Sequence, residues 1–158
     1  MDVLKDRIKK HEGFVNEVYN DSLGKRTVGY GHLCVEDHWE NNKKYTEEFL
    51  SGIFDEDFAN ANGLAMKMIG DIPLKQNSKE VIIEMCFQLG NRVSKFVKMW
   101  QALKNKDYQT ASLEMLDSNW HKQTPKRCES LAQIMRQDNQ VRTSNYHINF
   151  DDFCKGKD

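Results

Sequence analysis

The spacing of apolar side chains over the first twenty residues changes from a helical to an extended period. Leu4 and Ile8 share one face of residues 2–12, which predicts a short amphipathic helix. Gly13 is the kind of residue that ends a helix, because glycine adopts the left-handed conformation at little cost. The helical spacing is then lost: residues 15, 17 and 19 (V, E, Y) would alternate in an extended chain with residues 14, 16 and 18 (F, N, V), which we interpret as a β-strand.

The segment that follows completes a predicted β-hairpin. Residues 20–24 (NDSLG) have the composition of a turn. Residues 27–33 (TVGYGHL) are rich in β-branched and aromatic side chains and predict the returning strand.

From Thr46 onward the pattern is helical. Thr46 can cap a helix whose apolar stripe, at a spacing of 3.6 residues, continues to about residue 69. A nearly all-apolar helix is expected from Ser78 to Gly90, and its composition indicates a central, buried position. Further helices are expected over 93–103, 107–116 and 125–137.

These elements predict a mostly helical α+β domain over residues 1–158, with a small reduced β-hairpin lobe at one end. We expect the β lobe at about 13–45, a connecting helix at 46–69 and a helical lobe at 70–137. No role is assigned to the polar tail at 138–158. A cleft between the two lobes is the place to expect a functional site.

The charge of the chain is balanced overall but uneven along its length. The sequence has 23 Lys and Arg against 24 Asp and Glu, so a net charge of -1 gives no general attraction to nucleic acids or anionic membranes. Residues 36–57 are strongly acidic, whereas 92–106 carry Arg92, Lys95, Lys98, Lys104 and Lys106 and no acid. No apolar stretch is long enough to cross a membrane, and the first residues lack the apolar segment of a signal peptide.

Cysteines and histidines form no recognisable metal motif. Cys34, Cys86, Cys128 and Cys154 are widely spaced and are expected to be reduced thiols. The group His32, Cys34 and His38 matches no common zinc spacing, so neither a metal nor a cofactor is expected.

Glu12, Asp21 and Thr27 form the pattern E-x8-D-x5-T. Two carboxyl groups in different surroundings can hold different pKa values, so that one serves as an acid while the other stays ionised. A nearby hydroxyl can help to hold a water molecule, and an acid, a base and a water are what cleavage of a glycosidic bond requires. The spacing alone leaves open that these are an ordinary helix-end Glu, turn Asp and strand Thr.

Longer motifs around this pattern closely resemble phage-type lysozymes of glycoside hydrolase family 24, the family of the T-even phage lysozyme. The resemblance is carried at the N-terminus by residues 11–14 (HEGF), 19–21 (YND) and 27–33. It continues at 85–90 (MCFQLG) and 120–127 (WHKQTPKR), in the family's order and over most of the chain.

The resemblance implies an N-acetylmuramidase that hydrolyses the β-1,4 bond between N-acetylmuramic acid and N-acetylglucosamine in peptidoglycan. Glu12 falls on the general acid, Asp21 on the second carboxylate and Thr27 on the hydroxyl that positions water. Family members generally invert the anomeric centre, for which the two carboxyl groups should be about 6.5–9.5 Å apart.

The resemblance also implies supporting residues. Leu33 and Phe87 match positions that line the saccharide cleft, and Gln88 is expected to be a polar neighbour that binds substrate. Arg127 matches an arginine that pairs with the catalytic glutamate. His32 is expected to form a structural pair, for which Asp57 is the candidate carboxylate.

The expected partners are peptidoglycan glycan strands, with no nucleic acid, no stable membrane association and no cofactor. As an endolysin the protein would act as a monomer, accumulate in the host cytoplasm until lysis and need a holin to reach the wall. The alternatives are a lysozyme fold that binds peptidoglycan without cutting it, and a helical domain that uses the basic run 92–106 to bind nucleic acid.

The sequence also departs from the family pattern. The segment between Leu33 and Thr46 is short, so the β lobe is expected to shrink towards a hairpin plus a loop, with fewer outer sugar contacts. Met99 and Glu114 occupy two further cleft positions, which predicts altered recognition of the peptide or a distal sugar. His11, beside Glu12, would lower the pKa of Glu12 when protonated.

Overall fold

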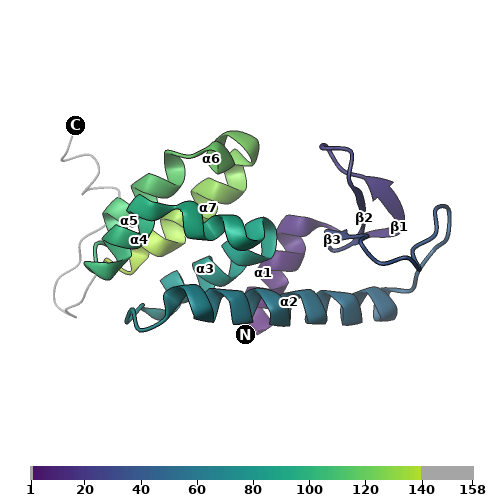
Figure 1. The fold of residues 1–158 in the computed structure, drawn as a ribbon, viewed down its shortest axis with the longest axis horizontal. Helices are drawn as coiled ribbons and strands as arrows, with labels where there is room; N and C mark the ends of the chain where they lie inside the picture. Colours follow the sequence, from purple (N-terminus) through teal and green to yellow (C-terminus); the bar gives the residue numbers. More distant parts are fainter. Residues whose placement is uncertain (1, 140–158) are drawn as a thin grey trace.

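Helix α1 (Asp2–Glu12) leads directly into a three-stranded antiparallel sheet in the computed structural model of the protein, which describes residues 2–139 (Figure 1). The strands β1 (Val15–Asn20), β2 (Arg26–Gly29) and β3 (His32–Leu33) lie in the order β1-β2-β3. The α+β class expected from the sequence is confirmed, with the sheet at one end of the molecule and most helices at the other.

The single returning strand predicted over 27–33 is wrong, because the chain reverses inside it. Gly29 and Gly31 have φ angles of +68° and +76°, and between them the chain turns at Tyr30. The ring of Tyr30 packs against Phe14 and Phe54, so its apolar character reflects packing within a turn. The reduced β lobe is therefore more than a hairpin plus a loop: it has a third strand, although of only two residues.

The β lobe has a small core of its own. It consists of three buried residues, Val28, Trp39 and Leu50. Trp39 belongs to the loop between β3 and the next helix, so its burial packs that loop against the sheet. Tyr45 adds a backbone hydrogen bond to the carbonyl of Asn16 on β1.

Helix α2 (Glu47–Ile69) joins this lobe to the rest of the molecule and runs along its long axis (Figure 1). Thr46 caps it as predicted, since its side chain accepts a hydrogen bond from the backbone N–H of Phe49. Leu50, near its start, belongs to the β-lobe core, whereas Phe54 and the buried apolar residues after it belong to the main core. Among residues 2–139, no helix is both long and apolar enough to cross a membrane.

Helix α3 (Gln76–Leu89) occupies the centre of the helical part, as its composition predicted, and ends at Gly90. The continuous helix expected over 93–103 is wrong. A 3-10 helix, η1 (Gly90–Lys95), comes first, and α4 (Val97–Lys104) begins only after Phe96 leaves the helical conformation. The indole N–H of Trp100 donates to the carbonyl of Val93, which holds η1 against α4.

Three more helices close the structure: α5 (Tyr108–Leu116), the short α6 (Asn119–Gln123), which the sequence pattern did not predict, and α7 (Pro125–Gln137). Asp138, placed in the tail by the sequence, is buried against α3. Its carboxylate accepts hydrogen bonds from the backbone N–H and the hydroxyl of Ser78, both at 2.6 Å. The rest of the expected tail, 140–158, lies outside the described residues.

Candidate active site

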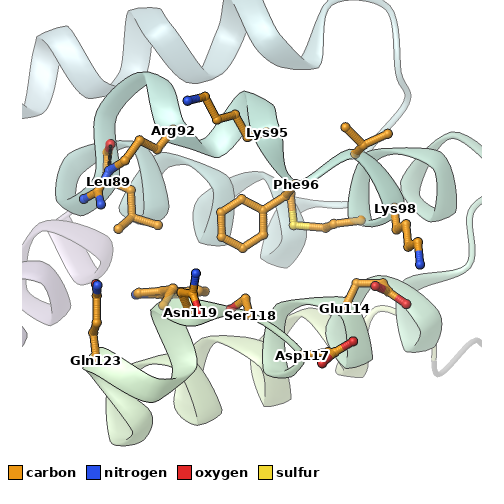
Figure 2. Close-up of a pocket in the computed structure, with 13 residues that line it drawn as sticks. Leu89, Arg92, Lys95, Phe96, Lys98, Glu114, Asp117, Ser118, Asn119 and Gln123 are labelled. Atoms are coloured by element: carbon orange, nitrogen blue, oxygen red, sulfur yellow. Dashed lines mark hydrogen bonds between the residues drawn. The ribbon is translucent and has the colours of Figure 1, made fainter.

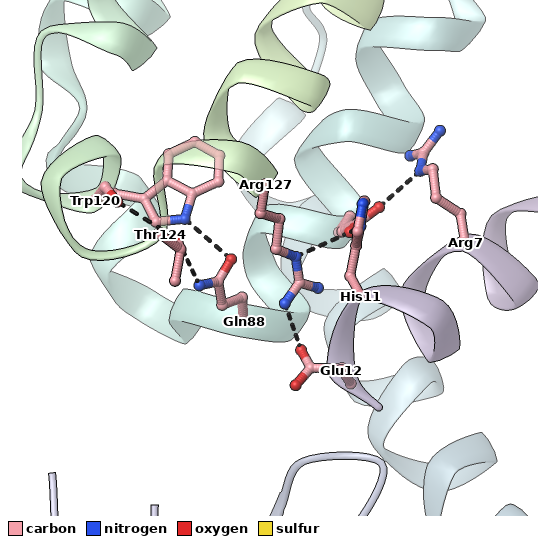
Figure 3. A network of polar contacts seen from close by, with 8 residues as sticks. Arg7, His11, Glu12, Gln88, Trp120, Thr124 and Arg127 are labelled. Atoms are coloured by element: carbon pink, nitrogen blue, oxygen red, sulfur yellow. Dashed lines mark hydrogen bonds and ion pairs between the residues drawn. The ribbon is translucent and has the colours of Figure 1, made fainter. Parts of the chain in front are cut away.

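Glu12 is the last residue of α1, and its carboxyl group faces the helical part of the molecule (Figure 3). Arg127 on α7 donates from Nη1 to Glu12 Oε2 at 2.8 Å. The ion pair implied by the family resemblance is therefore present. The side chains of Glu12 and Arg127 are only 15% and 9% exposed, so water screens the pair weakly.

Burial raises the pKa of Glu12 above its ordinary value. The charge and hydrogen bond of Arg127 oppose this rise, the negative charge of Glu84 adds to it, and His11 makes the smallest lowering contribution. The influence of His11 thus has the direction expected from the sequence, although its ring contacts Glu84. The net result is a carboxyl group that keeps its proton to a higher pH than an exposed glutamate does.

Asp21 lies in the turn between β1 and β2. Its Oδ1 accepts hydrogen bonds from the backbone N–H groups of Leu23 and Lys25, at 2.9 and 2.8 Å. These bonds fix the carboxylate within its own turn, as short Asx turns do. Its other oxygen has no hydrogen-bond partner among the described residues, so it can accept a hydrogen bond from a water molecule.

Thr27 lies at the centre of a row of side chains that crosses all three strands. It pairs with Tyr19 on β1 and with Leu33 on β3, so the three side chains project from the same face of the sheet. Thr27 is buried, and its hydroxyl donates to the carbonyl of Lys25 at 3.0 Å. With the hydroxyl proton used in this way, the oxygen remains able to accept a hydrogen bond.

Tyr19 is a site residue that the sequence interpretation did not single out. Burial raises the pKa of its phenol, and the carboxylates of Glu12 and Asp21 raise it further. Tyr19 therefore lies near enough to both carboxyl groups for their charges to affect its phenol. The sequence offered one signal for this role: Tyr19 lies between Glu12 and Asp21, and it shares the motif YND with Asp21.

The three residues expected to bind substrate have different surroundings. Leu33 is 44% exposed, as a surface that contacts sugar requires. Phe87 is partly buried and packs against Phe54. Both polar ends of Gln88 are occupied: its carbonyl accepts from the indole of Trp120 and its amide donates to Thr124 (Figure 3). Gln88 thus holds α6 and the start of α7 in place, and its contact with substrate remains a prediction.

His32 makes the pair with Asp57 that was proposed from the sequence, at 2.8 Å, and so ties β3 to α2. Its second nitrogen lies 2.9 Å from Glu36, which also accepts from the indole of Trp39. A ring with a carboxylate at each nitrogen is favoured in its charged form. The hydrogen bond to Asp57 is the main cause that raises the pKa of His32 to about 9.

A second site residue missed by sequence reasoning is Glu84, a wholly buried carboxylate on α3 in contact with Arg7, His11 and Arg127. The signal was a single acid within the otherwise apolar run 81–87. Within residues 2–139, no three or more His, Cys, Asp or Glu side chains are grouped so that they could hold a metal ion.

A cavity of about 550 Å³ lies farther along the helical part, between η1 and α4 on one side and α5 and α6 on the other (Figure 2). Arg92, Lys95 and Lys98 line the first wall, although the Lys95 nitrogen points away from the cavity, and Glu114 and Asp117 line the second. Met99 and Glu114, the two altered cleft positions, both line this cavity, although Met99 is fully buried. Its walls therefore present opposite charges to a ligand.

The mostly helical α+β fold, with a small sheet beside a buried acid, is lysozyme-like. The sequence model of the family described as phage lysozyme matches residues 9–139, so the chain belongs to the phage lysozyme family. A probable T4-type lysozyme 2 of Dictyostelium discoideum is 29% identical over 156 residues, covering 83% of this chain and 92% of that protein. A probable T4-type lysozyme 1 of the same organism is 27% identical, with 84% and 92% covered. An endolysin of Acyrthosiphon pisum secondary endosymbiont phage 1 is 30% identical over 116 residues, or 73% of this chain and 75% of that protein.

Proposed function

We propose that the protein is a lysozyme that hydrolyses the β-1,4 bond between N-acetylmuramic acid and N-acetylglucosamine in peptidoglycan, with inversion at the anomeric carbon. The observation that carries the proposal is Glu12, a largely buried carboxyl group whose pKa is raised by burial and which an arginine orients. Family membership supports the choice of substrate, as does the 25% identity to a peptidoglycan hydrolase of Pseudomonas phage phiKMV, of which this chain covers 15%.

In the first part of the reaction, protonated Glu12 gives its proton to the glycosidic oxygen as the bond to the anomeric carbon breaks. The ion pair with Arg127 then becomes stronger, because Glu12 becomes a carboxylate beside a fixed guanidinium. An interaction that strengthens as the reaction advances stabilises the transition state more than the bound substrate.

In the second part, a water molecule attacks the anomeric carbon from the opposite face of the sugar. The Thr27 oxygen accepts a hydrogen bond from this water, and the free oxygen of Asp21 takes the proton that it loses. The products are two shorter glycan strands. Glu12 regains a proton from solvent and Asp21 releases one.

Substrate contacts beyond the scissile bond would come from the apolar surfaces of Leu33 and Phe87 and from the cavity of Figure 2. We assign that cavity to the parts of peptidoglycan away from the cleaved bond. Action as a monomer and release to the wall through a holin after accumulation in the host cytoplasm remain predictions from the resemblance.

The test is the chemistry of the new chain ends. Purified peptidoglycan is digested, reduced with borohydride and analysed by mass spectrometry, with Glu12→Gln and the exposed Glu56→Gln as a matched pair of variants. We expect the wild type and Glu56→Gln to produce reduced N-acetylmuramic acid ends and Glu12→Gln to produce almost none. Reduced N-acetylglucosamine ends, or freed peptides, would contradict the proposed bond. Wild-type protein that binds peptidoglycan without releasing fragments would be the non-catalytic binding module.

A further inference from the structure

Glu84 is the one charged side chain in the apolar run 81–87 of α3, and its side chain is 0% exposed. A carboxylate in such a place is costly unless cations and hydrogen-bond donors surround it. Arg7 Nε donates to Glu84 Oε1 at 2.7 Å, and Arg127 Nε donates to Glu84 Oε2 at 3.0 Å. The ring of His11 also contacts Oε2.

The effect of these partners on the pKa of Glu84 is larger than the effect of burial. Burial pushes the pKa of Glu84 up, but Arg127, Arg7 and His11 together hold it below its ordinary value. Glu84 is therefore ionised wherever the protein is folded near neutral pH. It is a fixed negative charge in the interior, and it is connected to Glu12 through a single residue that bonds both carboxylates.

The connecting residue is Arg127, which binds both carboxylates with different nitrogens. Its Nε is held by Glu84 and its Nη1 points to Glu12 (Figure 3). A guanidinium is planar and rigid, so fixing Nε also fixes the direction of Nη1. The charge of Arg127 is at the same time shared between two carboxylates, which weakens its hold on the Glu12 anion.

We propose that Glu84 is a positioning residue for Glu12, because it fixes the guanidinium of Arg127 and balances its charge. Arg127 can then orient Glu12 while Glu12 stays protonated. This inference rests on the proposed function, in which Glu12 must be protonated to act. A neutral residue in place of Glu84 would leave Arg127 paired with Glu12 alone. Glu12 would then be held as a carboxylate and would be a poorer acid.

The groups that face Glu12 come from four elements: His11 from α1, Tyr19 from β1, Glu84 from α3 and Arg127 from α7. Arg127 bonds Glu12 directly, whereas Glu84 bonds Arg127, so the charge of Glu84 can be removed while the bond between Arg127 and Glu12 is kept. The decisive variant is therefore Glu84→Gln, which keeps the side-chain size. Glu80→Gln, one turn earlier on α3 and bonded only to Gln76 in the described structure, is the matched control.

The experiment measures two quantities on the full chain: the pKa of Glu12 by carbon-13 NMR titration, and the alkaline limb of the kcat–pH profile. We expect Glu84→Gln to lower the pKa of Glu12 by about one unit and to move the alkaline limb down by the same amount, with KM little changed. Glu80→Gln should move neither. An unchanged Glu12 titration in folded Glu84→Gln protein would overturn the proposal, because a purely structural ion pair changes stability alone.

Arg7→Gln provides an independent test by the same NMR titration if Glu84→Gln does not fold. This change removes a cation from the far side of Glu84, so Arg127 is drawn towards Glu84 and Glu12 should titrate at higher pH. A fall or no change would overturn the proposal. The NMR titration needs no turnover, so a catalytically inactive wild type would refute the proposed function and leave this test intact.

Discussion

The Cα of Gly31 faces the carboxyl group of Glu12 so closely that a methyl group on it would collide with Glu12 Oε1. Gly31 also has a φ of +76°, a conformation that residues with a Cβ rarely adopt. The turn between β2 and β3 thus forms one wall of the site around the acid. Glycine is required at this position for both reasons.

Gly31→Ala should therefore displace Glu12 and reduce kcat by about a hundredfold, as misplacement of a reacting group by an ångström can do. Gly90→Ala is the matched control, because Gly90 has a φ of +62° but nothing within 4 Å of the added methyl. Both variants should lose about 1–2 kcal/mol of unfolding free energy to backbone strain. A similar kcat in the two variants would show that the close approach of Gly31 to Glu12 is not needed for catalysis.

His32 should stabilise the protein most at neutral and mildly acidic pH. Folding raises the pKa of His32 from 6.5 to about 9, so its contribution is complete below about pH 6.5 and is lost as the pH rises through 9. We expect His32→Asn to lower the unfolding free energy by about 1–2 kcal/mol at pH 6, after allowance for solvent screening, and by much less at pH 10.

Denaturant unfolding at both pH values measures this difference. The control is His121→Asn, because His121 also contacts a carboxylate, Glu129, but its side chain is 31% exposed against 12% for His32. A surface pair of this kind should contribute about 0.5 kcal/mol or less. A loss for His32→Asn that is equal at pH 6 and pH 10 would contradict the charged bridge between β3 and α2.

The elements at the start of the chain were predicted well because local signals fix them. Gly13 ends α1 with a φ of +74°, and Thr46 caps α2, as the sequence indicated. The turn at Tyr30 was missed because an apolar ring in a turn has the same pattern as one in a strand. At the break between η1 and α4, Phe96 packs against Trp120, a contact with a distant residue that the local pattern does not contain.

The site shows the same division between local and distant information. The contact between Glu12 and Arg127 joins residues 115 positions apart and was predicted only through the family resemblance. Glu84 was detectable as a lone acid in an apolar run, but its three partners come from α1 and α7, which periodicity cannot bring together. Gln88 shows the converse, since a polar residue expected to face substrate is engaged by Trp120 and Thr124.

The basic side of the cavity in Figure 2 should attract peptidoglycan, because the peptides attached to N-acetylmuramic acid carry carboxylates. We expect the double variant Arg92→Gln/Lys98→Gln to raise KM on intact cell walls about three- to tenfold at low ionic strength, with little effect at high salt. Lys104→Gln/Lys106→Gln, which removes the same charge outside this cavity, is the control. Equal effects of the two pairs would mean that only net charge matters.

The central claim, that Glu12 acts as the acid while Asp21 and Thr27 direct water to the opposite face of the sugar, is tested most directly by the anomer first formed. Proton NMR of a soluble, uncross-linked glycan strand, recorded within the first minutes of cleavage, resolves the new reducing end before mutarotation. The account predicts that the α-anomer appears first and the β-anomer grows in later. Initial formation of the β-anomer would show retention and contradict it.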